Sequence, residues 1–155
     1  MDQLAKGESL CNLLLLLLLK DKKERLKSKN KQLTKFVEMD QRVTISAQMD
    51  KEDKNGPVIL INKFDVKAEN IDSFLKAWTK DAQIMKRQPG LISTQLHRGI
   101  AGSCVFINYA VWEESTRYYK QAFNNPEFQS TRKDYPACTI VSPQLLPIIS
   151  NYNRL

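Results

Sequence analysis

Polar side chains interrupt two stretches of the sequence that are otherwise apolar enough to form buried strands. Asn62 lies within residues 58–66 and Asn108 within residues 103–112. Because side chains alternate between the two faces of a strand, Asn108 shares a face with Trp112. An amide buried without a hydrogen-bond partner costs about 1–3 kcal/mol. Each asparagine therefore either bonds to neighbouring structure or is kept for a ligand, and the residue types alone leave both interpretations open.

The sequence lacks the signatures of the common catalytic classes. It has no glycine-rich phosphate loop, no GxSxG nucleophile motif and no HExxH zinc motif. The single histidine, His97, comes near the end of a predicted strand, and no nucleophile is marked beside it as a hydrolytic triad would require. His97 is therefore either a surface residue or a general base, and the pattern argues against a triad hydrolase.

The composition is that of one globular domain with a tail. The chain has 155 residues, of which 42% are hydrophobic and 26% charged, which is too apolar for a wholly disordered protein. Its 24 Lys and Arg against 17 Asp and Glu give a net charge of +7, spread out except for a dense patch between Lys20 and Lys35. This spread argues against nucleic-acid binding. Three scattered cysteines without a CxxC motif imply neither a zinc site nor a disulfide framework, so we predict a reducing, cytoplasmic location.

The composition changes at Gly56-Pro57, which is a turn signal after a run of charged residues. We predict a Leu-rich and Lys-rich extension over residues 1–56, partly helical or disordered, and a folded domain over residues 57–155. The leucine run from Leu13 to Leu19 is shorter than the about 20 apolar residues that cross a bilayer, and its flanks do not fit a signal peptide. We therefore expect no transmembrane segment. Residues 13–35 either contact an anionic membrane surface weakly or form a solvated basic helix.

Apolar periodicity predicts the elements of the domain in the order β-α-β-β-α-β, a ferredoxin-like α+β unit. The second helix is expected from about Glu114, and the last strand is expected to be interrupted by Pro143 and Pro147. The other predicted elements are a strand over 58–66, a helix over 71–85, a hairpin of strands 91–98 and 103–112, a helical turn over 126–132 and a final strand within 138–149.

Both faces of the predicted sheet are apolar. Ile59 and Ile61 lie on one face of their strand, while Leu60 and Phe64 lie on the other. Helices in a unit of this order cover a single face, so the second face needs a partner. The economical partner is a second copy, which predicts a homodimer with its two sheets face to face.

The segment Asn-Tyr-Ala-Val-Trp-Glu at residues 108–113, with Pro89-Gly90-Leu91 before a strand, resembles the antibiotic biosynthesis monooxygenase (ABM) family. The resemblance covers about residues 57–150. It implies a ferredoxin-like unit that dimerises into an α+β barrel.

The resemblance also implies a site. In the quinone-forming branch of the family, an Asn, a Trp four residues later, a Tyr six residues after that and a downstream Arg form the substrate pocket. The matching catalytic residues in this chain are Asn108, Trp112, Tyr118 and Arg132. Three further residues are candidates for additional pocket positions, namely Asn62, Trp78 and His97.

The implied reaction is oxidation of a small phenolic or anthrone-like aromatic by O₂ to a quinone, with no metal or flavin cofactor. In that chemistry Trp112 and Tyr118 serve as aromatic walls. The Asn108 amide donates to a developing oxyanion and Arg132 stabilises the anion.

Two alternatives stay open beside this interpretation. One is a non-catalytic dimeric α/β-barrel that binds small molecules or serves in stress. The other is the heme-degrading branch of the family, which Asn62 and Trp112 also match. That branch places a heme-ligating His at or near Arg132, and the sequence has no His after His97.

Overall fold

The computed structural model of the chain describes residues 19–20, 22, 34–51, 56–113 and 116–147. The chain forms two compact units, Met1–Gln32 and Leu33–Leu155. In the first unit the three described residues are helical. Most of the leucine run and of the basic stretch, on which the predicted membrane contact depends, lies outside the described residues. Within the part of the chain that is described, no helix is both long and apolar enough to cross a membrane.

The second unit contains a five-stranded sheet in the order β1-β5-β2-β4-β3. Strand β2 lies antiparallel between β4 and β5, β3 is antiparallel to β4, and β1 is parallel to β5. The strands are β1 Lys35–Phe36, β2 Val58–Asp65, β3 Leu91–Arg98, β4 Val105–Trp112 and β5 Ile140–Pro147. The helices are α2 Ile45–Asp50, α3 Ile71–Met85, α4 Thr116–Phe123 and α5 Pro126–Thr131, with 3₁₀ turns η1 Ala68–Asn70 and η2 Arg132–Asp134. From β2 onward this is the predicted ferredoxin-like α+β fold.

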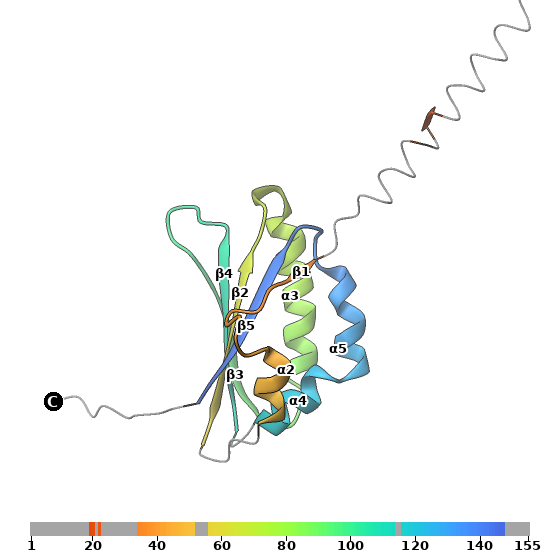
Figure 1. The fold of residues 1–155 in the computed structure, drawn as a ribbon. Helices are drawn as coiled ribbons and strands as arrows, with labels where there is room; N and C mark the ends of the chain where they lie inside the picture. The colour runs from red at the N-terminus through yellow and green to blue at the C-terminus, as the bar shows by residue number, and fades with distance from the viewer. Residues whose placement is uncertain (1–18, 21, 23–33, 52–55, 114–115, 148–155) are drawn as a thin grey trace, which may run out of the picture. The chain divides into compact units, whose positions relative to one another are not determined.

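All four helices lie on one side of the sheet (Figure 1). Helix α3 buries Phe74, Ala77 and Ile84 on that side, as its apolar spacing predicts. The β3–β4 hairpin turns through Gly102, whose φ of 76° is in the region that glycine favours. The other side of the sheet carries no element of the described chain.

The folded unit begins earlier than the predicted boundary at residue 56. Strand β1 pairs with the edge of β5, through Lys35 opposite Ile140 and Phe36 opposite Val141. Helix α2 buries Ile45 against the same core that the later strands form. Residues 34–51 therefore belong to the compact unit, because they supply both sheet pairing and apolar contacts.

The last strand also differs from the prediction. Residues 140–147 form one continuous strand that includes Pro143, which pairs with Asn62 of β2. Strand β1 covers β5 at Ile140 and Val141 alone, so Pro143 lacks a strand on its other side and its missing N–H costs no ladder bond.

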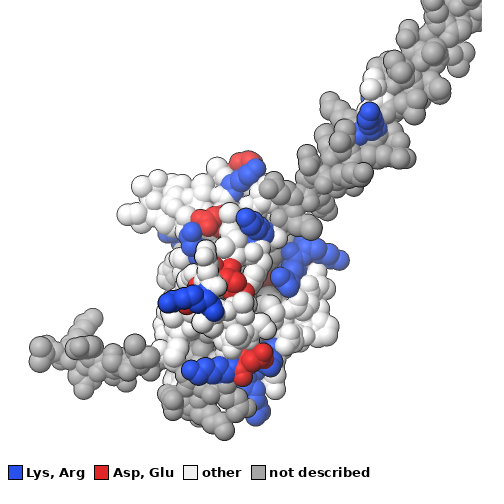
Figure 2. All heavy atoms as spheres, in the orientation of Figure 1, with Lys and Arg blue, Asp and Glu red and all other residues white. Residues whose placement is uncertain are grey.

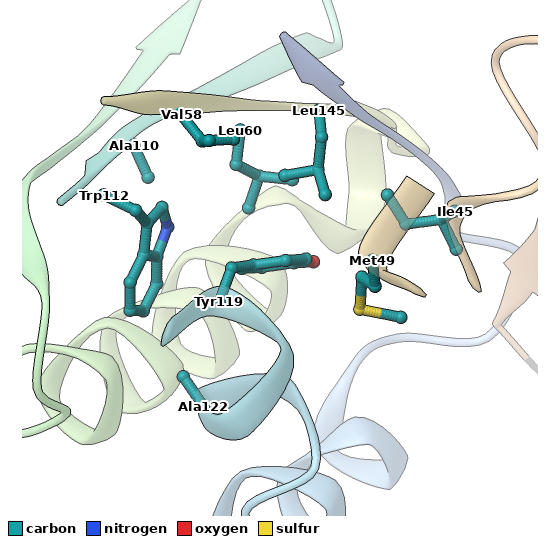
Figure 3. Close-up of a cluster of buried hydrophobic side chains, with 9 residues drawn as sticks. All are labelled: Ile45, Met49, Val58, Leu60, Ala110, Trp112, Tyr119, Ala122 and Leu145. Carbon is teal, nitrogen blue, oxygen red and sulfur yellow. The ribbon is translucent and has the colours of Figure 1, made fainter. Parts of the chain in front are cut away.

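The covered face of the sheet holds two clusters of buried apolar side chains. The first lies toward α2 and α4 (Figure 3). The second lies around the aromatic rings of Phe64, Phe74 and Phe106, with Tyr135 packed against it. The members of the first cluster are Ile45, Met49, Val58, Leu60, Ala110, Trp112, Tyr119, Ala122 and Leu145.

Charged side chains of both signs are interspersed on the face of the molecule that Figure 2 shows. Several of them form ion pairs between elements. Lys80 Nζ lies 2.6 Å from Asp134 Oδ2, and Arg87 Nη2 lies 2.8 Å from Glu127 Oε1. The first pair ties α3 to η2 and the second ties the turn after α3 to α5, each with a small contribution to stability.

Candidate functional site

The two strand asparagines face each other across neighbouring strands on the covered side of the sheet. Asn62 of β2 and Asn108 of β4 are direct Cα partners. By strand alternation they share that face with Leu60 and Ala110, which belong to the first cluster, and with Phe64, which belongs to the second. The asparagines therefore form a polar seam between two apolar clusters.

The carbonyl end of the Asn108 amide has a partner. The Thr94 hydroxyl of β3 donates to Asn108 Oδ1 at 2.8 Å, and Asn108 is buried. With the oxygen fixed, the amide nitrogen is the end left to serve a ligand as a donor. Thr94 was not among the predicted site residues. The sequence signal for Thr94 was a polar residue in a predicted strand that forms a hairpin with the strand of Asn108.

The Asn62 carbonyl end has no such partner. Its Oδ1 atom is buried and has no hydrogen-bond partner among the described residues. A buried polar atom in this state carries a desolvation cost of about 1–3 kcal/mol unless something else bonds to it. The site therefore presents one acceptor that a hydroxyl group on a ligand would satisfy.

Trp112 ends β4 and is buried, with 1% of its surface exposed. Its indole packs edge-on against Tyr119, with ring centroids 5.7 Å apart (Figure 3). The indole Nε1 atom is the second buried polar atom that lacks a partner within the described part of the chain. It supplies a donor on the same covered face that holds the orphaned acceptor.

Tyr118 lies beside Trp112's cluster and is partly buried there. Its ring rests on Gly90, where an added Cβ would come within 2.3 Å of the ring. Gly90 also has a φ of +83°, which side chains other than glycine rarely adopt. Both the close contact and the backbone conformation therefore exclude a larger residue at this position. The Arg117 guanidinium lies 5.7 Å from the centre of the Tyr118 ring. The predicted Tyr118 therefore packs against the cluster that contains Trp112, and the turn before β3 fixes its position.

Arg132 lies at the rim rather than among the asparagines. It is exposed, and its guanidinium carbon lies 5.8 Å from the centre of the Phe123 ring. Its Nη1 atom donates to Gln129 Oε1 at 3.2 Å. The Phe123 ring in turn lies 6.0 Å from Tyr119, so aromatic rings separate Arg132 from Trp112.

Two of the additional candidates lie apart from Trp112. Trp78 is partly buried against the second cluster, on the same side of the sheet but around different residues. His97 is exposed and pairs with Ile107, whose side chain lies on the uncovered face. The structure thus separates His97 from the seam by the thickness of the sheet. Of the three additional candidates, Asn62 is the one that lies directly beside a predicted site residue, Asn108.

Tyr119 contacts Trp112 directly, whereas the sequence resemblance selected its neighbour Tyr118. Burial raises the pKa of the Tyr119 hydroxyl well above its ordinary value, and the nearby charge of Arg132 opposes that shift in part. The hydroxyl therefore stays protonated over the physiological range. The signal for Tyr119 in the sequence was its place on the apolar face of the second helix.

The fold defines a class of protein: a ferredoxin-like α+β domain whose sheet carries its helices on one face. No group of three or more His, Cys, Asp or Glu side chains suited to a metal comes together among the described residues. The sequence pattern of the antibiotic biosynthesis monooxygenase family matches residues 57–134, and the chain belongs to that family. The expected enzyme class, a monooxygenase, is thereby confirmed. None of the curated proteins matches the chain.

Solved structures share the fold. SnoaB, a cofactor-independent oxygenase from Streptomyces nogalater, is 21% identical over 64% of this chain and 99% of its own, with a TM-score of 0.57. An asparagine-to-alanine variant of SnoaB is 20% identical over 63% and 98%, with a TM-score of 0.56. A proposed monooxygenase from Shewanella loihica PV-4 is 32% identical over 61% and 96%, with a TM-score of 0.50.

Proposed function

We propose that the chain is a cofactor-independent monooxygenase that oxidises a phenolic or anthrone-like aromatic with O₂ to a quinone. One observation carries the proposal: the covered face of the sheet holds an orphaned acceptor, Asn62 Oδ1, and an orphaned donor, Trp112 Nε1. A hydroxylated aromatic ketone offers a hydroxyl donor and an oxygen acceptor on a flat apolar body. That combination suits a polar seam between two apolar clusters.

The reaction needs little from the protein beyond binding and charge stabilisation. The substrate binds as the phenolate after its proton has passed to solvent, and the negative charge is shared with the ring carbon that reacts. Two electrons of that carbon and the O₂ molecule form a carbon–oxygen bond. The resulting peroxide anion takes up one proton from solvent, which balances the proton released at the start. Its oxygen–oxygen bond then breaks as the carbon loses its remaining hydrogen as a proton, which leaves a carbonyl and releases one water. O₂ is the sole oxidant in this sequence.

Each residue has a role that follows from its place. The Asn108 amide nitrogen, oriented by Thr94, donates to the phenolate oxygen as its charge develops. The Trp112 indole contributes a flat apolar wall together with a donor. Tyr118 adds a second aromatic surface, and Arg132 at the rim attracts an anionic substrate rather than touching the reacting atoms.

The proposal is tested with metal-free, full-length protein and a hydroxyanthrone, by oxygen uptake and quinone absorbance. We expect turnover that falls about 100-fold or more in Asn108→Ala, the loss typical of a removed oxyanion donor. We also expect a clear fall in Trp112→Phe, which keeps the apolar wall and loses the donor. Ile100→Ala is the control, because Ile100 is 91% exposed in the hairpin loop. Wild-type turnover in both site variants would refute the assigned site.

Two other outcomes would replace the proposal. Affinity for the aromatic without oxygen uptake would identify a binding protein. A Soret band on adding hemin, followed by its decay with a reductant, would identify a heme-degrading enzyme. Either result would overturn the proposed reaction.

A further inference from the structure

A short helix outside the family-matched residues completes the wall of the cluster that contains Trp112. The family pattern begins at residue 57, whereas α2 spans Ile45–Asp50. Ile45 and Met49, four residues apart on α2, are 4% and 8% exposed and belong to the first cluster. Helix α2, which lies outside the family-matched residues, therefore contributes side chains to the cluster around Trp112.

Tyr119 stands between the indole and this helix. Figure 3 shows its ring between Trp112 on one side and Met49 and Ile45 on the other. Its hydroxyl points toward α2. The two α2 side chains thus enclose the end of the cluster that lies opposite the indole.

Helix α2 is held on the domain by side-chain hydrogen bonds. Gln48 Oε1 accepts from the backbone N–H of Leu145 at 2.9 Å, on the edge of β5 that β1 leaves uncovered. The Thr116 hydroxyl donates to the carbonyl oxygen of Lys51 at 2.8 Å. Two further side-chain contacts join the helix to the domain: Gln48 Nε2 donates to Gln144 Oε1 at 3.2 Å, and Lys120 Nζ lies 2.5 Å from Asp50 Oδ1. None of these contacts is a strand ladder, so displacing the helix costs less than displacing a paired strand.

An open hollow of about 230 Å³ runs beside the same helix. Ala47 and Gln48 line it from α2, and Val58 and Leu145 line it from the sheet. Val58 and Leu145 also belong to the first cluster. The hollow therefore leads from solvent to the apolar side chains that surround the indole.

We propose that α2 is the cover of the substrate site, that the hollow beside it is the entrance, and that Met49 and Ile45 set how large a ring system the site accepts. This inference rests on the proposed function for the location of the site. It adds a specificity-determining wall that the family-matched residues do not supply.

The size-setting role is tested by calorimetric binding of two planar probes, naphthalene-2-sulfonate and anthraquinone-2-sulfonate, to the full-length protein. Met49→Ala removes apolar wall, so the ratio of three-ring to two-ring affinity should rise about tenfold, as expected for lost methylene groups in an apolar pocket. Met39→Ala is the matched control, because Met39 is 43% exposed in the same N-terminal segment. An unchanged ratio in folded Met49→Ala would overturn the role.

The entrance role is tested with variants that leave the core intact. Ala47 is exposed and lines the hollow, so Ala47→Phe fills the path and should slow association of the three-ring probe about tenfold in stopped-flow fluorescence. Ser46→Phe is the matched control, since Ser46 is also exposed on α2 but does not line the hollow. Equal association rates in the two variants would overturn the entrance.

These measurements separate the inference from the proposed reaction. Probe binding that responds to Met49→Ala and Ala47→Phe, without oxygen uptake, would support the cover and refute the monooxygenase. Oxygen uptake, together with probe binding that neither Met49→Ala nor Ala47→Phe changes, would support the monooxygenase and refute the cover. A wild-type protein that binds neither probe would overturn the cover as well, because the hollow would then lead to no site.

Discussion

At the scale of single residues, one hydroxyl decides which end of the Asn108 amide serves the site. Thr94→Val keeps the shape of the side chain and loses the bond to Asn108 Oδ1, so the amide is free to turn. We expect kcat with a hydroxyanthrone to fall about five- to tenfold, because a neutral hydrogen bond contributes about 1 kcal/mol. Thr94→Ser restores the hydroxyl and should recover most of the rate. Equal loss in both variants would indicate packing, not orientation.

Asn62 is expected to lower the stability of the fold while supporting activity. Its carbonyl oxygen is buried without a partner in the described structure, so Asn62→Leu replaces this unsatisfied oxygen with an apolar group in a side chain of similar volume. The free energy of unfolding in urea should rise by about 1 kcal/mol, while oxygen uptake falls. Asn108→Leu provides the comparison, because it breaks an existing bond and should lower stability. A loss of stability in Asn62→Leu would contradict the assignment of an orphaned oxygen.

At the scale of elements, a buried carboxyl joins α3 to α5 and η2. The hydroxyls of Thr131 and Tyr135 both donate to Asp81, which is 7% exposed. Burial raises the pKa of Asp81 above its ordinary 3.8, although these hydrogen bonds oppose the shift in part. The unfolded chain therefore releases this proton at lower pH than the folded one. Stability falls as pH rises from about 3.8 through the folded pKa and is level above it.

Asp81→Asn mimics the protonated carboxyl and removes that fall. The melting temperature of the variant minus that of the wild type should grow between about pH 3.5 and 7, when circular dichroism follows unfolding across the range. Asp72→Asn, on the same helix but exposed, is the matched control. A difference that shrinks with pH would reverse the inferred sign for Asp81.

The elements also show where sequence patterns carry information. Strand 91–98 and helix 71–85 were predicted to the residue, because each has dense periodicity and a clear Pro-Gly or glycine boundary. Helix α2 was missed because two apolar anchors, Ile45 and Met49, are too few for a period and a charged run follows them. The choice between Tyr118 and Tyr119 depends on packing against Trp112, which residue spacing does not encode. The sequence likewise did not show which face of the sheet His97 occupies. Its pairing with Ile107 places it on the uncovered face.

At the scale of the whole molecule, the uncovered face of the sheet predicts a second copy. Ile59, Ile61, Ile107 and Val111 are only partly buried there, on a surface that no helix of the described chain covers (Figure 1). They form an apolar patch on the two central strands, with polar side chains such as Gln95 and Gln144 on the flanking strands. An apolar patch with a polar rim is typical of an interface. We propose a homodimer through this face, in agreement with the resemblance to a dimeric barrel.

The oligomeric state tests that arrangement directly. Light scattering after size-exclusion chromatography should give twice the chain mass of 17.9 kDa for the wild type. Ile61→Glu places a charge at the centre of the face, opposite Tyr109 of β4 in the ladder, and should shift the protein to a monomer because burying a charge in an interface is costly. Ile100→Glu makes the same change at a residue 91% exposed in the hairpin loop and should remain dimeric. A monomeric wild type would refute the dimer, and a dimer in both variants would place the contact elsewhere. Since the seam lies on the opposite side of the sheet, a folded Ile61→Glu monomer should still bind the aromatic probe.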